Sequence, residues 1–149
     1  MADMRAVLMP MLLAEEGVRL MVYDDATGQP IKPGTLVKGH PTVGIGRALD
    51  TNGITEEEAE YLLGNDVEKV CLALDKDLPW WSGLTVNRRA VLAAMAFQMG
   101  VANLMGFKNT LASLKAGDYA GTARGMLASL WARQTPARAK RMADMMVRG

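Results

Sequence analysis

One stretch decides the fold: residues 15–25, which read EEGVRLMVYDD. Two acidic pairs lie at its ends, separated by a short and mostly apolar run. Gly17 follows the first pair directly, where a helix can end, because glycine adopts the left-handed backbone without Cβ strain. Over residues 18–23 every second residue is Val or Leu, and this period of two predicts a short, half-buried strand. The stretch therefore places one acidic pair at a helix end and the other just past a strand.

Carboxylates held apart on rigid elements are what glycoside hydrolysis requires, because one protonates the leaving oxygen while the other serves water or the developing cation. Glu16 would lie at a helix C-terminus, where the negative end of the helix dipole keeps an acid protonated for longer. That property suits a general acid. Nothing local distinguishes Glu16 from Glu15, or Asp25 from Asp24, and acidic pairs are most often solvated surface.

The composition suits one domain with a substantial core, because the chain has 149 residues and half of them are apolar. A single cysteine, Cys71, excludes an internal disulfide, and its place on an apolar helical stripe indicates a structural role. The single histidine, His40, falls in a Pro/Gly-rich loop, where we expect it to be exposed. One histidine and one cysteine cannot form a usual zinc site, and neither HExxH nor a P-loop is present. We therefore expect no metal and no cofactor.

The two halves of the chain differ in charge. Residues 1–84 carry 7 Lys/Arg and 14 Asp/Glu, whereas residues 85–149 carry 10 Lys/Arg and 2 Asp/Glu. A basic half is typical of proteins that meet a polyanion, either nucleic acid or the anionic polymers of a cell envelope. The alternative is that the two halves neutralise each other within one fold.

The apolar run at residues 6–14 contains Pro10 and is too short to span a bilayer. Asp3 stands in the region that would be basic in a signal peptide. The sequence therefore predicts synthesis in a cytoplasm, with any passage outward depending on another protein.

Periodicity and punctuation predict the order of the elements. Thr55 with Glu58 forms a capping box for a long helix, and Asn87 is a candidate N-cap for the next. Residues 90–97 are apolar on every side, which predicts a helix buried all round. The prolines and glycines of residues 26–41 indicate turns around a short strand at 35–38. The remaining predicted elements are helices 10–16, 56–75, 101–105, 108–116, 119–129 and 136–147, and strands 18–23 and 42–46.

A series of motifs, taken together and in order, resembles the phage-type lysozymes, the endolysins of glycoside hydrolase family 24. The resemblance covers residues 12 to about 147. The motifs are EGVRL at 16–20, YDD at 23–25, TVGIG at 42–46, GIT at 53–55, EAE at 58–60, NDV at 65–67, RRA at 88–90, FQMG at 97–100, Trp131, QTP at 134–136 and RAKR at 138–141.

The resemblance implies an α+β, lysozyme-like fold: one domain over 1–149, with a small antiparallel β-lobe at about 18–50, a helical lobe from 10–16 and 76–149, a connecting helix at 55–75, and a cleft between the lobes. Although it comes first, helix 10–16 is expected to pack with the helical lobe.

The family uses a Glu-Asp-Thr triad, which falls on Glu16, Asp25 and Thr42. By this resemblance Glu16 is the general acid, Asp25 orients the attacking water or stabilises the oxocarbenium-like centre, and Thr42 helps to hold that water. The family inverts at the anomeric carbon, so the two carboxyl groups should lie about 6.5–9.5 Å apart. Glu15 and Asp24 are then expected to be surface residues.

The substrate-binding residues implied by the resemblance lie in the second half of the chain. Gln98 and Trp131 match residues near the substrate cleft, and Arg138 matches an arginine near the catalytic acid. Taken alone, Arg138 would be a solvated helix charge and Trp131 a core aromatic; the order of the motifs favours the functional interpretation.

Two of the departures of this sequence from the family pattern concern the β-lobe. Sixteen residues separate Asp25 from Thr42, where the family has a much tighter turn, and this weakens the Thr42 assignment most. Arg47 replaces a family histidine whose acidic partner matches Asp66, so an Arg47–Asp66 pair is predicted.

The implied function is a muramidase that cleaves the β-1,4 bond between N-acetylmuramic acid and N-acetylglucosamine in bacterial peptidoglycan and lyses the host cell. We expect a monomer that acts on the wall after release and binds no nucleic acid, with the basic helix near the C-terminus as a possible contact to the anionic envelope or membrane. Two alternatives are a lytic transglycosylase on a related fold and a non-catalytic protein that binds wall or nucleic acid.

Overall fold

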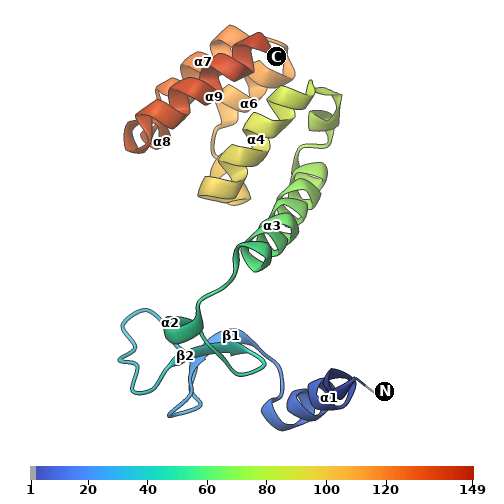
Figure 1. Ribbon diagram of the computed structural model, residues 1–149. Coiled ribbons are helices and arrows are strands. Elements are labelled where there is room, and N and C mark those ends of the chain that lie inside the picture. The colour runs from blue at the N-terminus through green and yellow to red at the C-terminus, as the bar shows by residue number, and fades with distance from the viewer. Residues whose placement is uncertain (1–2) are drawn as a thin grey trace. The chain divides into compact units, whose positions relative to one another are not determined.

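The computed structural model describes residues 3–149 and divides into two compact units, Met1–Ala59 and Glu60–Gly149, here called the N-terminal and C-terminal units. The elements are one small antiparallel sheet and a series of helices (Figure 1), so the predicted α+β class is confirmed. Among residues 3–149 no helix is long and apolar enough to cross a membrane.

The first helix, α1 (Met4–Glu16), is longer than the sequence predicted. It begins after Asp3, whose side chain accepts a hydrogen bond from the backbone N–H of Arg5, and it ends at Gly17 with φ +66°. The predicted end at Gly17 is confirmed, but the predicted start at Pro10 is wrong because Pro10 lies inside the helix. The Asp3 cap satisfies an N-terminal donor, so the helix starts six residues before Pro10.

The sheet of the N-terminal unit has three antiparallel strands in the order β1 (Arg19–Asp24), β2 (Pro41–Gly44) and β3 (Arg47–Ala48). In the β1–β2 register Tyr23 faces Thr42 and Asp24 faces Pro41. The loop between these strands contains no strand at 35–38, so that prediction is wrong; its one bridge joins Tyr23 to Pro30. The short α2 (Leu49–Asn52) follows β3.

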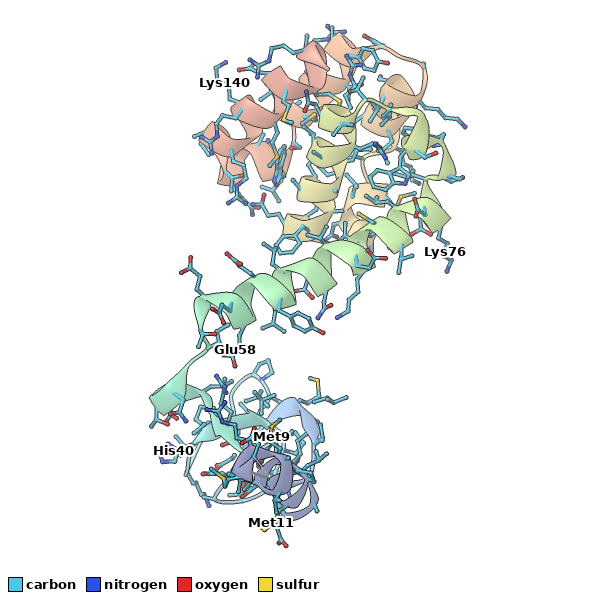
Figure 2. All side chains as sticks on the ribbon, turned by 45° about the vertical axis from the view of Figure 1, so that its right-hand side comes forward. Met9, Met11, His40, Glu58, Lys76 and Lys140 are labelled. Carbon is cyan, nitrogen blue, oxygen red and sulfur yellow. The ribbon has the colours of Figure 1, made fainter. Side chains whose placement is uncertain are left out.

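The long helix α3 (Glu56–Asp77) begins at the predicted capping box, which is confirmed. Thr55 Oγ1 accepts from the N–H of Glu58 at 3.1 Å, and Glu58 Oε2 accepts from the N–H of Thr55 at 2.8 Å. The Thr55 amide, followed by the charge of Arg47, lowers the pKa of Glu58. Arg47 Nη1 lies 2.7 Å from Glu58 Oε2 (Glu58 is labelled in Figure 2), a partner that the sequence analysis did not predict. The capping box thus places a carboxylate beside Arg47, and within the C-terminal unit Asp66 lies 3.7 Å from Lys69.

The C-terminal unit is helical. Its elements after α3 are η1 (Pro79–Gly83), α4 (Val86–Met99), α5 (Val101–Met105), α6 (Lys108–Lys115), α7 (Tyr119–Leu127), α8 (Leu130–Gln134) and α9 (Pro136–Arg148). Helix α7 packs against both α6 and α9 (Figure 1). The largest fully buried side chains of this unit are Leu74, Val91, Met95, Leu104, Leu114, Thr122, Met126 and Met146.

Helix α4 differs from its prediction in two ways. Its N-cap is Thr85, whose hydroxyl accepts from the N–H of Arg88, and not Asn87. It is buried on one face and not all round, because Ala90 and Phe97 are exposed while Val91, Leu92, Met95 and Ala96 are buried. Small alanines make a helix look apolar on every side without requiring that every side be covered.

Arg88 of α4 forms hydrogen bonds with the last turn of α9. Its guanidinium donates to the carbonyls of Met146 at 2.9 Å and Val147 at 3.2 Å, and it stacks on the ring of Tyr119. These carbonyls belong to the last turn of α9 and have no partner within the helix. A buried cation therefore caps the helix that carries Arg138.

Candidate functional site

Glu16 is exposed at the last position of α1 and lies against the turn between β2 and β3. The turn residue Gly46 has φ +73°, and a Cβ placed there would lie 3.1 Å from Glu16 Oε2. Only glycine allows both this backbone conformation and this close approach at no cost. The TVGIG motif thus brings the sheet next to the proposed acid.

Asp25 follows β1 and is exposed, and its carboxylate is held by the backbone of a distant loop residue. Asp25 Oδ1 accepts from the N–H of His40 at 2.6 Å, and the N–H of Asp25 donates to the carbonyl of His40 at 3.1 Å. Gly39 lies directly beside it, because a Cβ on Gly39 would collide with Asp25 Oδ1. The loop therefore closes on Asp25 through two residues that precede β2.

Thr42 lies on β2 and is only 3% exposed. Its Oγ1 donates to the carbonyl of His40 at 3.0 Å. Since this bond uses the only hydroxyl proton, Thr42 can act toward any further partner only as an acceptor. The structure thus brings Asp25 and Thr42 together on one peptide segment, that of His40, despite the sixteen intervening residues.

Asp24 is not a surface residue, which corrects the sequence prediction. It is 2% exposed, and its two oxygens accept from the backbone N–H groups of Ala26 at 3.0 Å, Lys38 at 2.7 Å and Gly39 at 3.0 Å. The Lys38 amide, followed by those of Gly39 and Ala26, lowers the pKa of Asp24 in spite of its burial. The bond to Ala26 closes a local turn of the kind that aspartate favours, and this turn was the one sign in the sequence that Asp24 has backbone partners. The other two join residues far apart in the chain.

We expect Asp24→Asn to open the loop. The carboxylate accepts from the backbone N–H groups of Lys38 and Gly39, the two residues joined by the bond that trypsin would cut. The variant should therefore be cut after Lys38 much faster than the parent, as followed by mass spectrometry of native protein. Because the pKa of Asp24 is lowered, this anchor holds at neutral pH and is lost only as pH falls below the ordinary aspartate range. The exposed Glu15→Gln is the control. Equal cleavage of Asp24→Asn and the parent would show that Asp24 does not close the loop.

His40 and Asp50 are two further residues of this region that sequence reasoning did not connect. The His40 side chain is half exposed, in agreement with its loop position (Figure 2), but its Nδ1 lies 2.9 Å from Asp50 Oδ2 on α2. Among the described residues no group of three or more His, Cys, Asp or Glu is placed to hold a metal ion.

The three predicted substrate-binding residues lie in the C-terminal unit. Trp131 is 6% exposed, and its Nε1 donates to Oε1 of the exposed Gln98 at 2.8 Å. Gln98 and the exposed Arg138 line a mostly apolar groove of about 480 Å³ between α3, α4 and α9. Trp131 lines a second hollow of about 510 Å³ beside α5 and α8. The Trp131–Gln98 bond therefore links residues on two neighbouring hollows.

Comparisons with known proteins place the chain in a family. The chain matches the family model described as phage lysozyme over residues 14–148. It is 33% identical to the pre-baseplate central spike protein Gp5 of Enterobacteria phage T4 over 93% of this chain and 27% of that protein. It is 28% identical to a probable T4-type lysozyme 2 of Dictyostelium discoideum over 95% of this chain and 94% of the relative. It is also 33% identical to the peptidoglycan hydrolase gp36 of Pseudomonas phage phiKMV over 86% of this chain and 14% of that protein. The chain thus spans less than a third of the two phage proteins and nearly all of the Dictyostelium one.

Proposed function

Because this chain belongs to the phage lysozyme family, and is by that membership a lysozyme-type glycoside hydrolase, we propose that it is a muramidase. Its substrate is bacterial peptidoglycan, and the bond that it cleaves is the β-1,4 bond between N-acetylmuramic acid and N-acetylglucosamine. The protein acts on the cell wall after release from the host cytoplasm, and the result is lysis of the host.

Glu16 is the general acid in this proposal. A general acid must reach the glycosidic oxygen and must hold a proton until the bond breaks. The exposed side chain of Glu16, at the last position of α1 and beside the turn at Gly46, supports the first requirement. Glu16 donates its proton to the leaving oxygen as the bond to the anomeric carbon lengthens.

The hydrogen bonds around His40 support a role for Asp25 and Thr42 in holding the attacking water; they are the observation that carries the proposal. The hydroxyl proton of Thr42 is committed to the His40 carbonyl, so Thr42 can only accept from water. Oδ1 of Asp25 is committed to the His40 N–H, which leaves Oδ2 for the water. A water whose two hydrogens point at Thr42 and Asp25 turns a lone pair toward the anomeric carbon. Asp25 takes one of these protons as the new C–O bond forms, with inversion.

Gln98, Trp131 and Arg138 bind the glycan in this proposal. An amide and a guanidinium that line the same groove are suited to the hydroxyl, acetamido and carboxylate groups of the two sugars. The Trp131 bond to Gln98 Oε1 leaves the amide N–H₂ of Gln98 as the donor toward substrate.

The products of digestion test this reaction. We expect purified peptidoglycan to yield muropeptides with a reducing N-acetylmuramic acid end, because water is the acceptor. Mass spectrometry distinguishes these from 1,6-anhydro products, which are lighter by one water. Anhydro muropeptides as the main product would instead assign the chain to the lytic transglycosylases. The absence of any cleavage would favour a non-catalytic wall-binding protein.

A further inference from the structure

We propose that His40 and Asp50 form a positioning pair that holds the water-binding half of the site in its active geometry. The inference rests on the proposed roles of Asp25 and Thr42. It concerns residues of the N-terminal unit alone, and neither member of the pair is needed to contact the substrate.

The backbone of His40 is the common support of both water-holding groups. Its N–H donates to Asp25 Oδ1, and its carbonyl accepts from both the N–H of Asp25 and the hydroxyl of Thr42. A shift of residue 40 would therefore move the Asp25 carboxylate and the Thr42 hydroxyl together. Displacements of about 1 Å can cost a reaction up to ~100-fold in rate.

The side chain of His40 connects this backbone to the helix that follows the edge strand β3. Nδ1 lies 2.9 Å from Asp50 Oδ2 and 3.1 Å from Asp50 Oδ1, and Asp50 is in the first turn of α2, directly after β3. Pro41 follows His40 and restricts residue 40 to an extended backbone. One end of the long loop is thereby fixed by its own covalent geometry and by α2, while Asp24 fixes Lys38 and Gly39 just before it.

The pair is too exposed to serve mainly as a source of stability. The side chains of His40 and Asp50 are 50% and 42% exposed, and ion pairs of this kind contribute little to folding. Its removal should therefore change the rate of hydrolysis and leave the melting temperature nearly unchanged. Loss of a purely structural contact would instead lower the melting temperature together with the rate.

The experiment measures kcat and KM on purified peptidoglycan for His40→Ala, Asp50→Asn and the double variant. We expect each single variant to lower kcat by roughly 3- to 10-fold with KM unchanged, and the double variant to be no worse than the poorer single one. Asp144→Asn is the matched control, since it removes an exposed carboxylate that lies 3.0 Å from Lys140 (labelled in Figure 2). A His40→Ala enzyme with the parent kcat, or single effects that multiply in the double variant, would overturn the proposal.

The pH profile is a second readout. The hydrogen bond and charge of Asp50, followed by the charges of Asp25 and Asp24, raise the pKa of His40. The charged pair is therefore complete below the ordinary histidine pKa and weakens as pH rises through the raised value. We expect kcat of the parent to fall over that pH range. In Asp50→Asn this fall should move to lower pH. In His40→Asn, whose amide can donate without titrating, the rate should be restored and the fall should disappear. An unchanged profile in both variants would contradict a positioning role.

Asp25→Asn and Thr42→Val separate this inference from the proposed function. If both of these variants keep full activity, the water-holding site itself is assigned wrongly. If both lose activity while His40→Ala does not, the site stands and only the positioning pair fails.

Discussion

Replacing Glu16 with glutamine should lower kcat by roughly 10²- to 10⁴-fold, the usual contribution of a positioned general acid. Glutamine has nearly the same shape, so it can occupy the place beside Gly46, but its amide cannot give a proton to the leaving oxygen. KM should change little because the substituted group acts on the transition state. The measurement is the release of reducing ends from purified peptidoglycan.

Glu15→Gln provides the matched control for this experiment. Glu15 is the exposed neighbour on the same last turn of α1, and its substitution changes the net charge by the same amount. We expect it to retain the parent rate. If Glu16→Gln releases reducing ends as fast as the parent, Glu16 is not the general acid. If Glu15→Gln is the inactive variant, Glu15 is the general acid.

Replacing Met126 with alanine should strongly destabilise the C-terminal unit. Met126 lies on α7, is fully buried, and borders the same small core hollow as Met146 on α9. The truncation leaves a cavity that close-packed helices refill only in part, and such changes cost roughly 2–5 kcal/mol. At roughly 2–4 °C per kcal/mol for a chain of this size, the melting temperature should fall clearly in a calorimetric or circular dichroism scan.

Met126→Leu tests whether volume is the cause. It keeps nearly the same apolar volume and should cost less than about 1.5 kcal/mol. A Met126→Ala protein that melts together with the parent would mean that the α6–α7–α9 packing is not what stabilises the C-terminal unit. Equal losses in the two variants would point to methionine itself and not to the cavity.

The correct sequence predictions concern features that a few neighbouring residues decide. The Thr55–Glu58 box, the end of α1 at Gly17 and the short β1 strand each depend on groups within about one turn or one strand pair. The start of α1 was missed because Asp3 competes with Pro10 as the initiating residue, and propensity alone does not rank the two.

Two features that the sequence analysis missed involve partners that lie further apart in the chain. Arg47 pairs with Glu58, a partner that the sequence analysis did not predict, because the helix cap already holds the Glu58 carboxylate in place beside it. Asp24 was expected on the surface, but its burial depends on the amides of Lys38 and Gly39, which no local pattern connects to it.

The sequence by itself determined the α+β class, the helix that ends at Glu16, and, through the order of its motifs, membership of the phage lysozyme family. Those features follow from short-range backbone preferences and from motif order, both of which are written along the chain. Only the tertiary structure decided how the long loop after Asp25 is closed: Asp24 binds its far end, and the His40 peptide joins Asp25 to Thr42. Backbone amides carry no sequence signature, so a site assembled from them becomes visible only when the chain has folded.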